Sequence, residues 1–356
     1  MSTIYDVAKL AGVSPKTVSR VVNGDAPVGK KTREKVETAI RELKYVPSSA
    51  ARMMRSNRSG LIGVVTGAIS RTAELSDPKG LPDLFILQGI QQVVAERDLT
   101  LMIADTAGQI DKVPALLRTF QEHRVEGLIY VADYHKRVAF ETATPACPLV
   151  LANCYDAHGT PAIVPDDKAC EKRLVERLTA HGHRRIAYLT FDPAMDAVPL
   201  RIEGYREALE AAGIAYDPAL VSPGYPINTE FLHQWLDEAL DRILALLEPP
   251  TVICCGNDEM AMQLYGLLRT RGIRVPEDIS IAGFDNYRAI AETLYPPLST
   301  VELPYAEMGR QAAELLLSMI SEEASRPHDP VRVAGRVFWR SSVTDLELES
   351  QTSKGG

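Results

Sequence analysis

The sequence has few cysteines and no long apolar segment, and both absences narrow the class of protein to which it can belong. Its five cysteines lie at scattered positions, with no CxxC pair and no spacing typical of a disulfide framework. No run of about 18 apolar residues is available for a membrane span, and no signal peptide precedes residue 1. We therefore expect a protein of the reducing cytoplasm with no membrane partner.

Signatures of catalysis and of metal binding are also missing. The sequence contains no Gly-rich phosphate loop, no GxSxG elbow and no HExxH motif. His181 and His183 flank a turn glycine and have no third ligand nearby, so we interpret this segment as a helix-to-strand connection. Asp166 and Asp167 could suggest acid–base work, but helix capping or hinge bonding is the ordinary explanation for such a pair. We predict a protein that is not an enzyme and that needs neither a metal nor a cofactor.

Charge is distributed unevenly along the 356 residues. Residues 1–60 hold twelve Lys or Arg and five Asp or Glu, a net charge of +7, whereas residues 61–356 hold 27 against 42, a net charge of −15. Phosphate binding needs a local positive potential rather than a basic protein overall. Only the amino-terminal segment is therefore expected to bind a polyanion.

Residues 3–24 show the pattern of two short helices joined by a tight turn. A first apolar stripe has helical spacing and comprises Ile4, Val7, Ala8 and Ala11. Gly12 tolerates the positive φ that a helix end usually adopts, Ser14 can cap the next helix, and Pro15 suits its first position. The buried face of the second helix is expected to comprise Val18, Val21 and Val22. This arrangement is typical of a helix-turn-helix, whose second helix enters the DNA major groove.

The outer face of the second helix carries residue types that recognise duplex DNA. Arg20 can donate two hydrogen bonds to guanine, and Lys16 can reach similar acceptors or a phosphate. Smaller polar side chains can contact phosphate oxygens, which set register without reading sequence, and these are Thr3, Tyr5, Thr17, Ser19 and Asn23. A solvated surface charge is the simpler explanation for any single Lys or Arg, whereas the turn, cap and charge pattern together predict DNA binding.

A third helix is expected from about Lys31 to Leu43. Its inward-facing residues are Val36, Ile40 and Leu43. Pro47 ends it, and residues 48–59 are expected to form a hinge helix or linker. That segment carries arginines around the apolar pair Met53-Met54, residue types suited to a helix that folds on DNA and inserts a wedge into the minor groove. A basic linker with two incidental methionines is the alternative.

In these residues the chain resembles the LacI/GalR family of bacterial repressors. The matching segments are DVAKLAGVS, TVSRVVNG, TREKVETAIRELKYVP and AAR. The resemblance implies that bases are read by Pro15, Lys16 and Arg20, and that the minor-groove hinge comprises Ala51, Met54 and Arg55. Met54 occupies the place of the family's intercalating Leu and is a more flexible wedge. Pro15 cannot donate a hydrogen bond, so its base contact can only be apolar.

The remaining residues, nearly 300 of them, suit a two-lobed α/β domain. Apolar runs alternate with helical patterns, which indicates parallel sheets covered on both faces, and the runs are LIGVV, LTLMIA, GLIYVA, PLVLA, RIAYLT, TVICCG and ISIAGF. The resemblance implies a periplasmic-binding-protein-like fold of two doubly wound lobes. Three crossovers are expected to join them, near Val164, near Pro304 and around 326–330.

The domain boundaries follow from this reading. The all-α helix-turn-helix headpiece is expected at 1–47 and the effector-binding and dimerisation domain at 60–345. Lobe one is expected at 60–163 with 304–326, and lobe two at 164–303 with 327–345. Residues 346–356 are expected to be a disordered tail, and they contain no leucine heptad that would suggest a tetramerisation helix.

Polar residues at the carboxyl ends of the predicted strands are candidates for a ligand site, because parallel sheets bind ligands there. Asn153, Asn257 and Asp285 follow apolar runs, and Arg201 begins the helix after RIAYLT. Such groups can hydrogen-bond a cluster of hydroxyls. The candidate stacking faces for a pyranose ring are Phe85 and Tyr225.

The resemblance assigns an effector-binding role to Arg201, Asn257 and Asp285, the last two through the motifs GNDEMA and GFDN. Asn153 is a weaker match, because several sugar-binding members carry Asp there. Residues 66–84 are longer than the usual stretch of the family, which bears on the choice of Phe85. Asp258 is open between a helix cap and a ligand contact.

Together these observations predict a ligand-responsive repressor of a carbohydrate-utilisation operon, cytoplasmic and associated with the bacterial nucleoid. It is expected to bind double-stranded operator DNA as a homodimer, at a palindrome with half-sites about one helical turn apart, because one recognition helix reads too few base pairs. The expected effector is a sugar. The alternatives are a purine or other non-sugar metabolite in the same architecture, or a cytoplasmic solute-binding relay protein whose headpiece contacts another protein.

Overall fold

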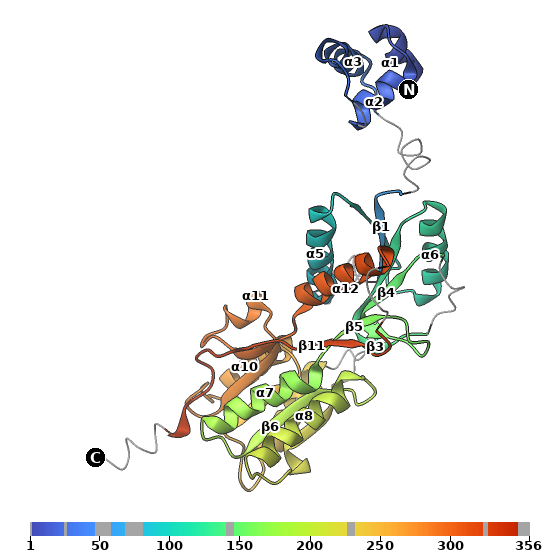
Figure 1. Cartoon of the computed structure of the whole chain (residues 1–356). Coiled ribbons are helices and arrows are strands. Elements are labelled where there is room, and N and C mark those ends of the chain that lie inside the picture. Colours follow the sequence, from blue (N-terminus) through green and yellow to red (C-terminus); the bar gives the residue numbers. More distant parts are fainter. Residues whose placement is uncertain are drawn as a thin grey trace. The chain divides into compact units, whose positions relative to one another are not determined.

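The computed structural model of the chain describes residues 2–24, 27–46, 58–67, 81–139, 146–225, 232–322 and 327–347. The chain divides into two compact units, one formed by Met1–Leu61 with Arg124–Glu126 and the other by the remainder (Figure 1). Outside the described residues lie most of the long segment 66–84, the end of the expected tail at 348–356, and the expected hinge residues Ala51, Met54 and Arg55.

Three helices form the headpiece: α1 (Ile4–Ala11), α2 (Pro15–Asn23) and α3 (Lys30–Leu43). The local signals that predict the turn are present in the structure. Thr3 and Asp6 form a capping box at the start of α1, and Gly12 ends that helix with a φ of 66°. The Ser14 hydroxyl accepts a backbone N–H of α2 at 3.1 Å, with Pro15 in the first helical position.

The headpiece has a small apolar core of its own. Val7, Val18 and Val36, one from each helix, are completely buried. Ile40 and Leu43, which are expected to face inward, are partly buried and pack against this cluster. Because each helix supplies part of one shared core, none of the three short helices is stable without the others.

The first sheet, which defines lobe one, has six strands in the order β11-β5-β4-β3-β1-β2. Their bounds are β1 (Leu61–Thr66), β2 (Thr100–Asp105), β3 (Gly127–Arg137), β4 (Leu149–Tyr155), β5 (Ala162–Pro165) and β11 (Val331–Val333). The pairings β1–β3, β3–β4, β4–β5 and β5–β11 are parallel. One face is covered by α5 (Leu81–Glu96) and α12 (Tyr305–Ile320), and α6 (Val113–Glu122), preceded by a short 3-10 turn (Ile110–Lys112), lies on the other (Figure 1).

The second sheet, which defines lobe two, has the order β12-β10-β9-β8-β6-β7 and is parallel except for β12. Its strands are β6 (Ile186–Phe191), β7 (Val221–Tyr225), β8 (Val252–Cys255), β9 (Ser280–Asp285), β10 (Ser299–Glu302) and β12 (Val337–Phe338). The helices α7 (Asp167–Ala180) and α8 (Ala197–Ala211) cover one face, and α9 (Leu232–Leu244) and α10 (Asp258–Thr270) cover the other. A 3-10 turn (Pro218–Leu220) precedes β7, and the short α11 (Arg288–Ala291) follows β9.

The chain passes between the two lobes three times. The first passage follows β5, which ends at Pro165, and the second lies between β10 and α12, at Pro304. The prediction of a third crossover around 326–330 is wrong, because Val331–Val333 pairs in parallel with β5. β11 therefore belongs to lobe one and not to lobe two, and the third crossover lies at 334–336, between β11 and β12.

All seven apolar runs that predict strands are strands in the structure. The sequence pattern does not reveal the other five, which are β5, β7, β10, β11 and β12. Four of these have four residues or fewer, and β7 contains Pro223 and Gly224, so none forms a long apolar run. In the parts of the chain that the structure describes, no helix combines the length and the apolar character that crossing a membrane requires.

Two glycines allow α5 and α12 to cross closely in lobe one. A Cβ atom at Gly309 of α12 would stand 2.0 Å from the Ile86 carbonyl oxygen of α5. A Cβ atom at Gly89 of α5 would stand 1.9 Å from the Ala306 carbonyl oxygen of α12. Both obstacles are backbone atoms, which cannot rotate away as a side chain can. The packing of this helix pair on the sheet therefore requires glycine at both positions.

We expect Gly309→Ala to lower the free energy of unfolding by about 1–3 kcal/mol, the usual effect of overpacking a core. Urea denaturation followed by circular dichroism measures the change. The matched control is Gly266→Ala in α10, where an added Cβ meets no atom within 4 Å. That control is expected to gain up to about 1 kcal/mol from better helix propensity. Equal effects of the two substitutions would contradict the close crossing.

Candidate functional site

The second helix of the headpiece presents a polar outer face. Lys16 and Arg20 are exposed, and because they stand four residues apart they lie on the same side of α2. Pro15, at the start of the helix, is partly exposed. Val18 and Val21 are buried, so the packing of α2 determines which of its side chains point outward.

Several residues that are expected to contact phosphates also hold the headpiece together. The Thr3 hydroxyl is part of the capping box of α1, and the Thr17 hydroxyl lies 2.9 Å from the hydroxyl that caps α2. Asn23 Nδ2 donates to the carbonyl and hydroxyl oxygens of Ser19. Tyr5, by contrast, is 71% exposed. The phosphate contacts of these residues stay predictions.

In lobe two, Arg201 of α8 lies across the carboxyl ends of three strands. It is 5% exposed, and it donates from Nε to Asp167 Oδ1 at 2.7 Å and from Nη1 to the Gly256 carbonyl at 2.8 Å. Its guanidinium carbon stands 3.6 Å from the ring centroid of Phe284 and 6.0 Å from that of Phe191. Phe191, Gly256 and Phe284 lie at the ends of β6, β8 and β9, the edge at which parallel sheets bind ligands.

Asp167 connects this site to lobe one. It is the first residue of α7 and is completely buried, and its Oδ2 lies 2.7 Å from His135 Nδ1 on β3. Desolvation opposes ionisation, but the charge of Arg201 and the hydrogen bond with His135 hold the pKa of Asp167 below its ordinary value. The preceding Asp166 caps α7 by accepting the Ala169 amide at 3.1 Å. The interpretation of this acidic pair as a cap and a hinge contact is confirmed.

A second contact between the lobes starts from Asp196. Although it is the N-cap residue of α8, its carboxylate makes no capping bond to that helix. Its Oδ2 instead accepts the Arg137 amide of β3 at 2.7 Å and the Tyr155 hydroxyl of β4 at 3.3 Å. A hollow of about 290 Å³ adjoins this contact and is lined by Tyr134, Lys136, Arg137, Asp192, Ala194, Met195 and Asp196.

The carboxyl ends of β8 and β9 carry two further expected effector residues, Asn257 and Asp285. Asn257 caps α10, and its Oδ1 accepts a backbone N–H of that helix at 2.8 Å. Asp258 is not this cap. Its buried carboxylate accepts the Thr300 hydroxyl and the Tyr287 amide, both at 2.6 Å. It thereby holds the loop that begins at Asp285, where φ is 107°, a strained value for a residue with a side chain.

The other expected effector residues lie at different places. Asn153 of β4 is 1% exposed, and its amide donates to the Ala132 carbonyl of β3 at 3.0 Å. Phe85 lies in α5 and is partly exposed. Tyr225 ends β7, but its side chain lies outside the described residues. The structure thus gathers Arg201 with Asn257 and Asp285 at one edge, and the effector roles of all six stay predictions.

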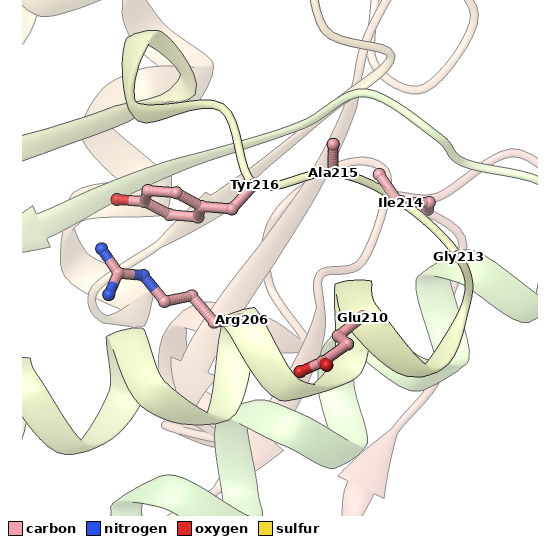
Figure 2. A pocket seen from close by; sticks show the side chains of 6 residues that line it. All are labelled: Arg206, Glu210, Gly213, Ile214, Ala215 and Tyr216. Carbon is pink, nitrogen blue, oxygen red and sulfur yellow. The ribbon is translucent and has the colours of Figure 1, made fainter.

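A larger hollow, of about 630 Å³, lies at the far end of α8 and is shown in Figure 2. Its lining residues, all exposed or partly exposed, are Arg206, Glu210, Gly213, Ile214, Ala215 and Tyr216. The Arg206 guanidinium points to the Tyr216 ring, 4.0 Å from its centroid. This segment leads from α8 towards β7, so it lies at the amino ends of the strands, opposite the edge that carries Arg201. It offers no desolvated polar group to a ligand.

Sequence reasoning misses two partners of this site. His135 follows a predicted apolar strand, and 32 residues separate it from Asp167. Phe284 ends the run ISIAGF and has the pattern of an ordinary core residue. The one available signal was the Asp166-Asp167 pair at the expected crossover.

Comparison with known proteins decides the family. Residues 3–48 match the bacterial regulatory proteins of the lacI family, and residues 175–343 match the periplasmic binding protein-like domain. The HTH-type transcriptional repressor PurR of Vibrio atlanticus (strain LGP32) is 31% identical over 327 residues, covering 91% of this chain and 93% of that protein. The chain belongs to the LacI family.

Other members support the assignment over nearly the whole length of this LacI-family chain. The ribose operon repressor of Escherichia coli (strain K12) is 31% identical over 325 residues, covering 90% of this chain and 94% of that protein. The crystal structure of the Lac repressor dimer bound to operator and the anti-inducer ONPF is similar with a TM-score of 0.77 and 26% identity, covering 96% and 99% of the two chains. The predicted family, fold class and role as a ligand-responsive transcriptional regulator are confirmed.

The second histidine of the segment HGHRRI contacts two neighbouring groups. His183 Nδ1 lies 2.8 Å from the Thr251 hydroxyl, and its Nε2 lies 3.0 Å from the Thr344 carbonyl oxygen. Among the residues that the structure describes, no group of three or more His, Cys, Asp or Glu is arranged to hold a metal ion.

Glu171 of α7 is a buried carboxyl group near Arg201. Its side chain is completely buried, and neither of its carboxyl oxygens has a hydrogen-bond partner. Desolvation raises the pKa of Glu171 from 4.5 to about 8. Between these two values the folded protein binds a proton that the unfolded chain has released. The stability linked to this proton is complete below about pH 4.5 and is lost as the pH rises through about 8.

We expect Glu171→Gln, which removes the titration and keeps the shape, to become more stable relative to the wild type as the pH rises from 5 to 9. The difference should reach on the order of a few kcal/mol and is measured by urea denaturation at each pH. Glu176→Gln, on the exposed side of the same helix, is the control and should follow the wild type. A difference between Glu171→Gln and the wild type that is independent of pH would show that Glu171 does not titrate in this range.

Proposed function

We propose that this chain is a homodimeric repressor whose operator affinity is set by a small molecule bound beside Arg201. The observation that carries the proposal is the exposed pair Lys16 and Arg20 on one face of a helix-turn-helix, in a segment whose net charge is +7. Such a face, rigidly packed on a small core, is suited to enter the major groove.

Each part of the headpiece has a role in this proposal. Arg20 donates to guanine O6 and N7, Lys16 contacts a neighbouring base or phosphate, and Pro15 makes an apolar contact. The start of α3 binds a backbone phosphate, because Gly29 provides no side-chain cap and Lys30 adds positive charge there. Phosphate contacts position the helix, and base contacts select the sequence.

A dimer follows from how little one recognition helix can read. The base-reading residues of α2, from Pro15 to Arg20, span roughly one and a half helical turns and reach only a few base pairs. Two headpieces related by two-fold symmetry double that contact set, so the operator is a palindrome with half-sites about one helical turn apart. The similar Lac repressor structure is described as a dimer bound to operator.

We propose a sugar as the effector and a carbohydrate-utilisation operon as the target. Arg201, Asn257 and Asp285 offer donors and acceptors for paired hydroxyl groups, and the partly exposed Phe191 offers a flat apolar face. One similar protein is named for the ribose operon. A purine is the second candidate, because its planar ring can stack on the Phe191 ring.

The coupling of ligand to DNA runs through the contacts between the lobes. Arg201 and His135, from different lobes, share the carboxylate of Asp167. A ligand that alters the position of Arg201 acts directly on that shared contact and hence on the angle between the lobes. A hundredfold change in operator affinity requires a preference of about 2.7 kcal/mol for one lobe arrangement, which is comparable to one or two charged hydrogen bonds.

We expect Arg20→Ala to weaken binding to the selected operator tenfold to a hundredfold, because a bidentate guanine contact contributes about 1–3 kcal/mol. The operator is first selected in vitro from random duplex DNA, and affinities are measured by fluorescence anisotropy at several salt concentrations. Binding to scrambled DNA should weaken much less, since it depends mainly on phosphate contacts. Equal losses on both duplexes would remove Arg20 from the base-reading set.

We expect Asp285→Asn to bind operator with wild-type affinity and to lose the response to the effector. The exchange keeps the shape of the side chain, and Asn tolerates the positive φ at this position. The response is the change in operator affinity on adding the compound that stabilises the wild type. Asp278→Asn, in an exposed pair with Arg274, is the matched control and should respond normally. A normal response in Asp285→Asn would place the effector elsewhere.

A further inference from the structure

We propose that the effector of this protein is an uncharged molecule, and that its site excludes sugar phosphates, sugar acids and nucleotides. The inference rests on the proposed function, because it takes the surroundings of Arg201 as the effector site. It concerns charge alone, so it applies equally to a sugar and to a nucleobase.

Arg201, the buried cation among the described residues of the site, already has its counter-charge. The guanidinium of Arg201 lies against Asp167 at 2.7 Å, and both side chains are almost completely buried. Another of its N–H groups is taken by the Gly256 carbonyl, and the face of the guanidinium covers the Phe284 ring. A ligand that approaches this wall therefore meets polar N–H groups but no net positive charge.

Two described cations at the rim are paired as well. Lys136 forms an ion pair with Asp133, and Arg340 bonds Asn286 and lies 3.6 Å from Glu292. Arg137 lines the rim hollow together with Lys136, but Asp192 and Asp196 line the same hollow. The rim therefore offers an anion as many carboxylates as cations.

Helix amino termini, which usually bind phosphate, carry carboxylate side chains at this edge. α7 begins with Asp166 as its cap and Asp167 in its first turn. α10 has Asp258 and Glu259 in its first turn, and the N-cap residue of α8 is Asp196. A carboxylate in the first turn satisfies the positive end of the helix dipole. A phosphate at any of these three positions would face a side chain of like charge.

Further carboxyl groups stand behind the wall. Glu171 lies near Arg201 inside the lobe, and Asp258 lies near Asp285. Desolvation and the neighbouring carboxyl of Asp258 raise the pKa of Asp285 well above its ordinary value, although Arg201 acts in the opposite direction. A carboxyl group that resists ionisation marks a position where a further negative charge is unfavourable.

Three segments, which follow β1, β3 and β7 in the sequence, lie outside the described residues. Their composition does not change the balance of positive and negative charge. Residues 68–80, 140–145 and 226–231 together contain two Lys or Arg and four Asp or Glu. The sequence therefore supplies no excess of positive charge for an anionic ligand from these segments.

The physical consequence is that this site strongly prefers uncharged ligands over anionic ones. A phosphate or carboxylate that leaves water needs cations or several free N–H groups to replace its hydration. Hydroxyl and ring N–H groups need only paired donors and acceptors, which Arg201, Asn257 and Asp285 supply. An uncharged sugar or nucleobase therefore fits the groups at this edge, whereas its phosphorylated form does not.

A thermal-unfolding screen with matched pairs tests the inference on the full chain. The pairs are D-ribose with ribose 5-phosphate, D-glucose with glucose 6-phosphate and with gluconate, cellobiose with cellobionate, and hypoxanthine with inosine 5′-monophosphate, all at millimolar concentration. At least one uncharged compound should raise the unfolding midpoint by about 2 °C or more, and its anionic partner should not. Stabilisation by an anionic member, or by no uncharged member, overturns the inference.

Asp167→Asn provides a second, independent measurement. It removes the counter-charge of Arg201, so glucose 6-phosphate and inorganic phosphate should stabilise this variant more than they stabilise the wild type. Asp278→Asn is the matched control, because it also releases an arginine from its carboxylate, but at an exposed position. No gain in anion binding by a folded Asp167→Asn variant contradicts the charge argument. If that variant does not fold, the wild-type screen still decides.

Operator binding separates this inference from the proposed function. A sugar phosphate that stabilises the protein and shifts its operator affinity overturns the charge preference and leaves the regulatory proposal intact. An uncharged compound that stabilises the wild type and Asp285→Asn equally, without changing operator affinity, contradicts the proposed effector site.

Discussion

The buried ion pair between Asp167 and Arg201 is the interaction on which the sensing domain depends. Two charges remain stable out of water only when their geometry is good and their remaining hydrogen-bond groups are satisfied. Here the Gly256 carbonyl and His135 complete the set, and the Phe284 ring covers the guanidinium. Removal of either charge would leave the other uncompensated in the core. The pair therefore joins α7, α8 and the end of β8 into one wall before any ligand binds.

The same pair lies at the boundary between the lobes, so it also takes part in the contact between them. β3 runs for eleven residues, and its far half reaches the start of α7 and of α8 through His135 and Arg137. One of the contacts between the lobes, that of His135 with Asp167, is thus made by the carboxylate that also positions Arg201. A ligand needs to change only one or two hydrogen bonds there to alter the equilibrium between lobe arrangements.

The headpiece follows a different principle. Its three helices are short and its core is small, so its shape comes largely from caps and turns close in sequence. The polar side chains at these caps and turns form hydrogen bonds within the headpiece, whereas Lys16 and Arg20 remain exposed. The headpiece is a basic unit with a core of its own, so its fold does not depend on the acidic remainder of the chain.

The sequence by itself determined the features that depend on residues close together along the chain. Gly12, Ser14 and Pro15 predict the turn of the headpiece because capping and φ preferences act within about four residues. Asn257 and Asp285 are predicted at one edge because polar residues that end apolar runs meet there in a parallel sheet, and Arg201 is predicted there because it begins the helix after such a run. Only the tertiary structure decided their partners.

His135 and Asp167 are 32 residues apart, and Asp167 and Arg201 are 34 apart, in elements whose spacing no periodicity encodes. The short β11 joins lobe one only because β5 offers it an edge. Hydrogen bonds between lobes and pairing at sheet edges depend on three-dimensional proximity, and that information does not appear in a local pattern of residues.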